Sequence, residues 1–169
     1  MFGDLARARL IAGTAAFIGL IALGSWISIP FFPVPLTLQT LFVLLAAAVL
    51  HRYAVIPVSL YLLLGALGLP LFHNGVAGIG VLLGPTGGYL LGFIPAALFA
   101  GLAYEHRSAG IRVAGIVAAT LAIYTCGIAW LMFSTGLTLV PAVTLGVLPF
   151  IPGDGVKAFA AWRIGERLP

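Results

Sequence analysis

The chain has 169 residues, of which 62% are hydrophobic and only 7% are charged, and its mean hydropathy is +1.20. Soluble domains carry about 25% charged residues, so this composition excludes a soluble protein and indicates one integral membrane domain over residues 1–169. The net charge of +4 is confined to the ends of apolar segments and therefore does not indicate nucleic-acid binding. Cys126 is the only cysteine, which excludes an internal disulfide and favours a small buried apolar residue.

Six apolar segments follow one another along the chain, and a helical membrane span needs roughly 20 such residues. Met1 to Arg9 leads into the first segment without a clear cleavage site, so we expect the first span to act as the insertion signal. Pro149, Pro152 and Gly153 interrupt the sixth segment, so we expect its backbone to break there and its final regular helix to begin near Pro152. The sequence thus predicts an all-α bundle of six transmembrane helices, over residues 10–29, 36–50, 53–69, 87–104, 110–133 and 141–163.

Charged and titratable residues gather at alternate ends of these six segments. The connections near residues 30–35, 70–86 and 134–140 contain no charged residue. The other ends carry Arg7, Arg9, His51, Arg52, Glu105, His106, Arg107, Arg112, Arg163, Glu166 and Arg167. By the positive-inside rule the charged side is cytoplasmic, which predicts that both termini are cytoplasmic.

Asp154 and Lys157 are the two charged residues that lie away from that side. Ionisable groups inside a membrane are costly and usually face a cavity and a partner. Three residues apart on a helix, the two side chains share a face and offer one acceptor-only and one donor-only group. The pair is compatible with a site for a small polar ligand, with a proton or ion pathway, and with a structural ion pair that fixes one helix.

The connection over residues 69–88 is long, uncharged and rich in glycine. Long loops in compact domains are commonly functional, and glycine lets backbone approach a ligand closely. The segment is too apolar to be a free solvated loop, so we predict that it folds back over the bundle as a lid. The alternative is a packed connector. It contains His73, the only histidine on this side.

Small residues recur every four positions in the first predicted helix, at Ala8, Ala12 and Ala16, with Gly24 further along the same stripe. Such spacing lets another helix approach closely. The stripe fits packing inside this bundle and contact with another protein equally well.

Motifs for catalysis are missing from the sequence. There is no G-x-x-x-x-G-K-[ST] loop for ATP, no H-E-x-x-H motif and no zinc-type spacing of Cys and His. No G-x-S-x-G motif occurs, and four scattered acidic residues cannot place a second carboxylate beside Asp154. We therefore expect no enzymatic activity, no metal site and no bound cofactor.

Four motifs together resemble the BioY family, whose members are biotin-binding substrate-capture (S) components of energy-coupling-factor (ECF) transporters. Each motif alone is modestly specific, but they occur in the family's order across residues 30–160. They are P-V-P-L-T-L-Q-T (33–40), Y-L-L-L-G-A-L-G-L-P (61–70), G-P-T-G-G-Y-L-L-G-F (84–93) and P-F-I-P-G-D-G-V-K (149–157).

The resemblance implies a six-helix S component of a prokaryotic cytoplasmic membrane, with biotin near the outer face beneath the loop between the third and fourth helices. It also implies a transmembrane coupling protein and two ATPase subunits as partners, so that ATP is used only by the partners. The family pattern places ligand contacts on Asp154, on Lys157 and on a lid asparagine, for which Asn74 is the only asparagine available. The face of Ala8, Ala12 and Ala16 resembles the surface that docks on the coupling protein.

The chemistry of biotin agrees with these residues. Asp154 can accept a hydrogen bond from a ureido N–H, Lys157 can donate to the ureido carbonyl, and Asn74 can do both. The backbone N–H groups of residues 86–88 (Thr86, Gly87 and Gly88) begin a helix and suit the carboxylate. Gln39 is an interior polar residue with either a binding or a helix-bridging role. Aromatic residues for the apolar ring system, equally compatible with a core role, are Tyr61, Tyr89, Phe93 and Trp26.

The sequence therefore predicts high-affinity capture and uptake of biotin. The alternative is a free-standing secondary transporter of biotin or another small vitamin that uses Asp154 as a proton-linked group. Neither inverted repeats nor further ionisable groups for a relay are evident, which disfavours the alternative.

Overall fold

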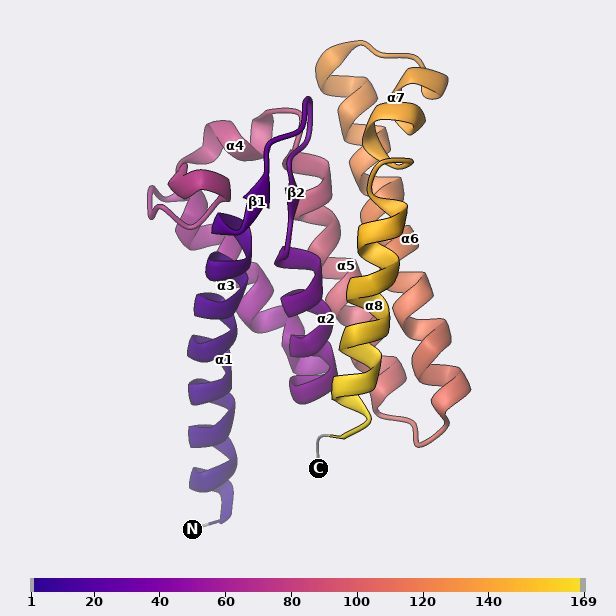
Figure 1. Cartoon of the computed structure of the whole chain (residues 1–169). Coiled ribbons are helices and arrows are strands. Elements are labelled where there is room, and N and C mark those ends of the chain that lie inside the picture. Colours follow the sequence, from indigo (N-terminus) through magenta and orange to yellow (C-terminus); the bar gives the residue numbers. More distant parts are fainter. Residues whose placement is uncertain (1, 168–169) are drawn as a thin grey trace.

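The structure, a computed structural model, describes residues 2–167 and folds them almost entirely into helices (Figure 1). A short hairpin of β1 (Ser28–Ile29) and β2 (Leu36–Thr37) pairs antiparallel between the first two helices. The helices and short 3-10 turns are α1 (Phe2–Trp26), α2 (Gln39–Leu50), η1 (His51–Ala54), α3 (Val55–Ala66), η2 (His73–Gly75), α4 (Ile79–Leu83), α5 (Gly87–Tyr104), α6 (Ala109–Thr135), α7 (Leu139–Gly146) and α8 (Ile151–Gly165).

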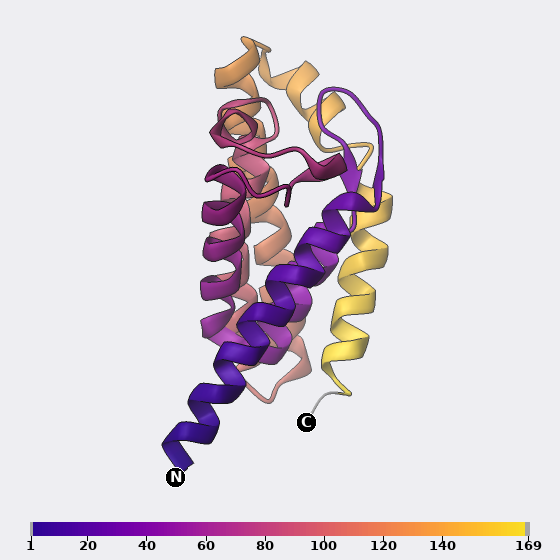
Figure 2. The same cartoon turned by 90° about the vertical axis from the view of Figure 1, so that its left-hand side faces the viewer.

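Within the described residues, four helical runs are long and apolar enough to cross a membrane, and a fifth is obtained if α7 and α8 form one broken span. The four are Arg7–Trp26, Gln39–Ala66, Gly87–Tyr104 and Ala109–Thr135. The second run is folded back on itself, because η1 reverses the chain and α2 and α3 run in opposite directions (Figures 1 and 2). The predicted all-α membrane fold is confirmed, whereas six separate spans stay a prediction.

The predicted break in the last segment is present. α7 and α8 meet at an angle of 54° across the residues between Gly146 and Ile151. α8 begins one residue before the predicted start, and Pro152 lies in its first turn, where a missing N–H costs nothing. The break places the first turn of α8, which carries Asp154, below α7 and the end of α6 rather than at the end of the bundle (Figure 1).

Charged residues meet at one end of the bundle, called here the charged end, where α1 begins and α8 ends (Figure 1). Arg52 Nε donates to Glu105 Oε1 over 2.6 Å, and Arg112 Nη1 lies 2.8 Å from Glu166 Oε1. The hydrogen bond from Arg52 lowers the pKa of Glu105 below its ordinary value. These contacts join segments far apart in the sequence, and they confirm that the charges share one end.

Close contact between α5 and α6 gives the site a rigid wall. Gly88 faces Trp130 and Gly92 faces Ile123, and neither glycine leaves room for a side chain. Small residues at such an interface let two membrane helices approach closely. α5 and α6 therefore hold their inward-facing residues in fixed positions.

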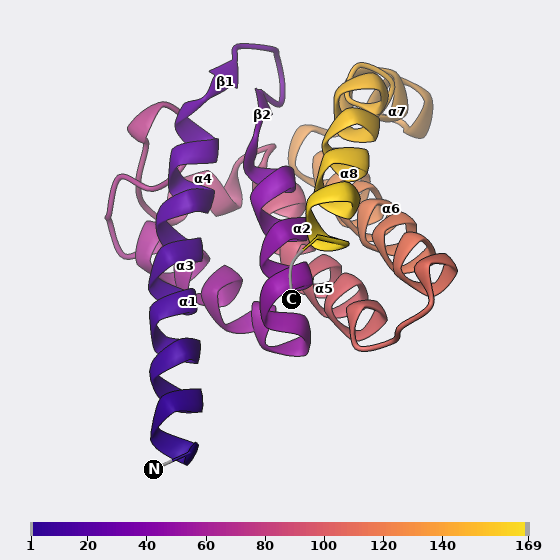
Figure 3. The ribbon, with the colours of Figure 1, turned by 60° about the horizontal axis from the view of Figure 1, so that its bottom comes forward.

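The small-residue stripe of α1 divides into two parts. Ala8, Ala12 and Ala16 are exposed, on a helix whose first half stands apart from its neighbours (Figure 3). Gly24 is buried instead, against the ring of Phe42 and the backbone of Leu38. The upper part of the stripe thus packs within the bundle, and the lower part forms a free face.

The segment between α3 and α5, predicted as a lid, is partly helical and anchored at one point. The Phe72 side chain is fully buried, edge-on to Tyr61 with ring centroids 5.6 Å apart. Phe72 also fills the space that the missing side chain of Gly65 leaves. Part of the segment therefore behaves as the packed connector considered above, while movement of the remainder stays a prediction.

Candidate functional site

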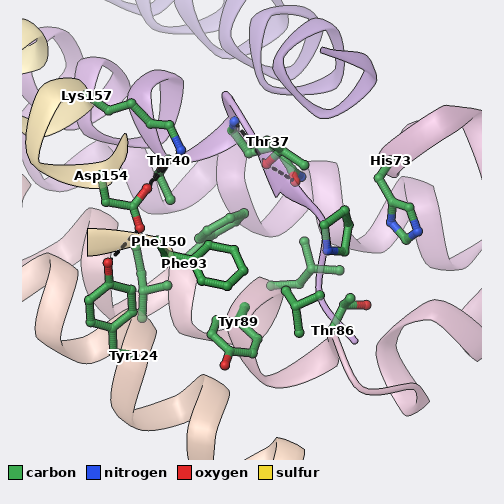
Figure 4. Close-up of a pocket in the computed structure, with 15 residues that line it drawn as sticks. Thr37, Thr40, His73, Thr86, Tyr89, Phe93, Tyr124, Phe150, Asp154 and Lys157 are labelled. Carbon is green, nitrogen blue, oxygen red and sulfur yellow. Dashed lines mark hydrogen bonds and ion pairs between the residues drawn. The ribbon is translucent and has the colours of Figure 1, made fainter. Parts of the chain in front are cut away.

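A cavity lies near the uncharged end of the bundle, where the β hairpin and η2 meet α2, α5, α6 and α8 (Figure 4). Its free volume is about 50 Å³, well below the roughly 300–1,000 Å³ of pockets that hold small ligands. A ligand of several rings therefore requires the hairpin and η2, which form the roof of the cavity, to move away or the helices that form its walls to move apart. The lining residues are Val34, Pro35, Thr37, Gln39, Thr40, His73, Thr86, Tyr89, Leu90, Phe93, Ile123, Tyr124, Phe150, Asp154 and Lys157.

Asp154 is the centre of a hydrogen-bond cluster at one end of this cavity (Figure 4). Lys157 Nζ lies 2.8 Å from Oδ1, and the Thr40 hydroxyl donates to the same oxygen over 3.2 Å. The Tyr124 hydroxyl donates to Oδ2 over 2.8 Å. Asp154 is only 8% exposed, so these donors take the place of water around its charge.

The cluster has capacity left for a ligand. A carboxylate offers about four acceptor positions. Three donors bond to Asp154, so about one of its acceptor positions stays open. Lys157 carries three N–H donors, and its bond to Asp154 uses one of them. This end of the cavity can therefore both accept and donate a hydrogen bond within a short distance.

Aromatic rings line the middle of the cavity. Tyr89 and Phe150 are stacked with ring centroids 6.3 Å apart, and Phe31 of the hairpin meets Phe150 edge-on at 6.4 Å. The Tyr89 hydroxyl donates to the carbonyl of Gly146 over 2.9 Å, which ties α5 to α7. Because this hydroxyl is already bonded, Tyr89 offers the cavity its ring rather than a polar group.

Gln39 combines the two roles left open by the sequence. It lines the cavity and also joins α2 to α3, because its Nε2 donates to the Tyr61 hydroxyl over 2.7 Å. The Tyr61 hydroxyl in turn donates to the carbonyl of Leu71 over 2.9 Å, and the hydroxyl of Ser25 donates to the same carbonyl. The cavity wall is thus connected to the start of the segment that carries η2.

Several of the predicted binding residues line the cavity: Asp154, Lys157, Gln39, Thr86 and Tyr89. Phe93, one of the aromatic candidates, lines it as well. Tyr61 is buried behind Gln39, and Trp26 is 50% exposed with its Nε1 bonded to the carbonyl of Pro70.

The remaining predicted residues lie beside the cavity rather than on its wall. Asn74 is exposed and accepts a hydrogen bond from the Ser28 hydroxyl over 2.8 Å. The amide of Gly87 donates to the carbonyl of Gly84 over 3.0 Å, and Gly88 packs against Trp130. In this conformation, Gly87 and Gly88 serve the packing of α5, and Asn74 serves the contact between η2 and the hairpin.

Several lining residues were not predicted from the sequence. Tyr124 carried a signal, because a tyrosine in an apolar helix usually finds a partner for its hydroxyl when buried. Thr40 and Phe150 lie inside the motifs quoted above, but nothing local indicates that they face Asp154 or the cavity. The hairpin residues Val34 and Pro35 come from a proline-rich connection, which indicated irregular backbone and not a roof.

These features describe a class of protein: a helical membrane protein with a cavity between its helices, a buried ion pair at one end of the cavity and aromatic rings beside it. Such an arrangement suits capture of a small amphipathic solute.

The chain belongs to the BioY family, whose family model matches residues 3–169. It is 43% identical over 162 residues to the biotin transporter BioY of Thermotoga maritima, covering 95% of each chain. It is 41% identical to the probable biotin transporter BioY of Pyrococcus horikoshii, covering 96% of this chain and 97% of the relative. Its structure resembles a crystal structure of the S-component for biotin from an ECF-type ABC transporter, with a TM-score of 0.87 and 25% identity over 97% of this chain and 92% of the other.

Proposed function

We propose that this chain captures biotin in the membrane and is the substrate-binding subunit of an ECF-type transporter. The main support for this proposal is the buried Asp154–Lys157 pair, which faces a cavity lined by aromatic rings. Full-length similarity to curated biotin transporters and to a biotin S-component supports the same function. Transport, rather than catalysis, is also the role of the family.

In the proposed complex, the ureido ring of biotin lies against Asp154 and Lys157. The free acceptor position of Asp154 takes one ureido N–H, and Lys157 donates to the ureido carbonyl. The apolar thioether ring lies between Tyr89 and Phe93, and Gln39 contributes a further polar contact. Asn74 and the amides of residues 86–88 would reach the ligand only after the loop moves. No cofactor is required.

We further propose how the subunit sits in the membrane and in the transporter. α2 and α3 each cross the membrane, which gives six spans with the charged end and both termini on the cytoplasmic side. The exposed face of Ala8, Ala12 and Ala16 docks on a transmembrane coupling protein. That protein links the subunit to two ATPase subunits in a prokaryotic cytoplasmic membrane.

The alternative, a free-standing secondary transporter with Asp154 as proton carrier, fits the cluster less well. Protonation of Asp154 would remove the negative charge that Lys157, a group with donors only, pairs with over 2.8 Å. Proton uptake would therefore leave the Lys157 ammonium without its partner charge in a largely buried position.

The test is binding of labelled biotin to the purified protein in lipid nanodiscs, followed by uptake in cells with and without a coupling module. We expect saturable binding that unlabelled biotin displaces, and uptake that increases with the module. A purified, folded protein that fails to bind biotin would overturn the proposal. Uptake that is unchanged by the module but abolished by collapse of the proton gradient would favour the secondary transporter.

A further inference from the structure

His73 lines the cavity at the end opposite to Asp154, Lys157 and Tyr124 (Figure 4). Its position is fixed by its neighbours in the chain. The preceding Phe72 side chain is fully buried, and the amide of Val76 donates to the His73 carbonyl over 3.1 Å. Asn74 has a φ of 54°, in the left-handed region, and its side chain bonds to Ser28 outside the cavity. Of the two polar residues of η2, His73 is therefore the one that faces the cavity.

The His73 imidazole has hydrogen-bonding capacity to offer. Among residues 2–167, no side chain or backbone group makes a hydrogen bond or ion pair with it. Its partial burial lowers its pKa below the ordinary value of 6.5, which favours the neutral imidazole when no anion is bound. The charged groups of the cavity, Asp154 and Lys157, are paired with each other at the far end. No charged residue occurs next to η2 in α1, the hairpin, α4 or α5. The other titratable side chains that line the cavity are those of Tyr89 and Tyr124.

Two other donors at this end of the cavity are already used. The Thr86 hydroxyl donates to the carbonyl of Val81 over 3.3 Å, and the Gly87 amide donates to the carbonyl of Gly84. An anionic group arriving here would therefore find the imidazole as the available partner that can carry a positive charge. The cavity thus has the polar groups of Asp154 and Lys157 at one end, aromatic rings in the middle and His73 at the other end. A ligand with a ureido ring at one end and a carboxylate at the other matches this arrangement.

We infer that His73 binds the carboxylate tail of the ligand as an imidazolium ion, so that ligand binding takes up a proton. This inference rests on the proposed function and names the residue that recognises the tail. The sign of the pH dependence follows from linkage. A bound anion favours the charged imidazole and raises its pKa, so affinity increases as the pH falls through the histidine range. Each unit by which the pKa rises corresponds to about a tenfold gain in affinity.

The test compares two ligands and two proteins over a range of pH. Biotin has an ionised tail throughout, because ordinary carboxyl groups titrate near pH 4, whereas biotinamide has an uncharged tail. For the wild type, we expect the Kd for biotin to fall about tenfold from about pH 8 to about pH 5.5 and the Kd for biotinamide to stay constant. For His73→Gln, we expect a biotin Kd that no longer depends on pH in this way and an unchanged Kd for biotinamide. Unchanged binding of biotinamide also shows that the variant is folded.

His106→Gln provides the matched control, because it removes a histidine at the charged end, and its biotin titration should match the wild type. The inference is overturned if wild-type biotin affinity is constant over this range, or if His73→Gln keeps the full pH dependence. It is also overturned if His73→Gln weakens biotin and biotinamide equally, because that result indicates a purely structural role. If the folded wild type binds neither ligand, the proposed function fails, and the inference fails with it.

Discussion

Two ion pairs in this protein have similar lengths and different surroundings. Arg112 and Glu166 lie 2.8 Å apart at the charged end, and Lys157 and Asp154 lie 2.8 Å apart beside the cavity. The side chains of the first pair are 21% and 31% exposed, and those of the second are 13% and 9% exposed. The distance between opposite charges therefore does not by itself determine what an ion pair contributes to stability or binding.

The exposed pair is solvated whether or not it forms, so it contributes about 0–1 kcal/mol. The buried pair gives up its hydration, and only the donors around Asp154 and the mutual attraction offset that cost. Such a pair adds little net stability, but removal of one member leaves an unpaired charge. We therefore expect the pair beside the cavity to serve binding, whereas the pair at the charged end joins α6 to the C-terminal end of α8.

The largest effect is expected from breaking the buried pair. Asp154→Asn or Lys157→Ala should lower the free energy of unfolding by about 3–5 kcal/mol and strongly weaken biotin binding. Glu166→Gln, which breaks the exposed pair, should change stability by about 0–1 kcal/mol and leave binding unchanged. Calorimetric titration with biotin and thermal unfolding in detergent measure both quantities. Near-wild-type affinity in both cavity variants would show that the pair is structural.

The second prediction concerns the exposed face of α1 near the charged end, which is proposed to dock on a coupling protein. Ala12 and Ala16 lie one turn apart, and replacing both with leucine adds bulk where a coupling protein would dock. We expect uptake by the full transporter to be lost while biotin binding to the purified variant is unchanged. Leucine at both Ala114 and Ala118, which are exposed one turn apart on α6, is the matched control for added bulk away from the α1 face. Normal uptake by the double variant would contradict the docking role.

The hydrogen bond from Tyr124 provides a finer test of the cavity end. Tyr124→Phe keeps the ring but removes a donor to a charged carboxylate, a bond that is typically worth about 1.5–3 kcal/mol. We expect biotin affinity to decrease by about tenfold. Tyr89→Phe removes a hydroxyl that bonds to a neutral carbonyl, so its cost should be about 0.5–1.5 kcal/mol, mainly in stability. Equal losses of affinity in the two variants would mean that Tyr124 does not act through Asp154.

The features that could be predicted from the sequence are those with a local cause. A charge in an apolar chain is costly wherever the chain goes, so Asp154 and Lys157 were identifiable without a fold. Pro149 and Pro152 restrict their own backbone and indicated the break between α7 and α8. The alternating charges indicated which connections share one end.

The features that could not be predicted depend on contacts between distant segments. Thr40 reaches Asp154 across 114 residues of sequence, and no local pattern sets that meeting. The left-handed backbone of Asn74 directs its side chain to Ser28, so that His73 and not Asn74 lines the cavity. Residue type alone does not reveal which of these two neighbours faces the cavity. Gly87 and Gly88 were assigned to a ligand because their backbone N–H groups begin a helix, but here the two glycines are in close contact with Leu82 and Trp130.

The smallest effect is expected at the exposed contact between Arg52 and Glu105. The hydrogen bond from Arg52 lowers the pKa of Glu105 in the folded protein, so the folded state binds its proton less readily than the unfolded chain. The stabilisation from this contact is therefore complete above the ordinary glutamate pKa of 4.5 and is lost as the pH falls through the lowered value. Thermal unfolding of wild type and Glu105→Gln should differ slightly at neutral pH and converge in acid. A difference that persists or grows in acid would mean that Glu105 acts through packing and not through its charge.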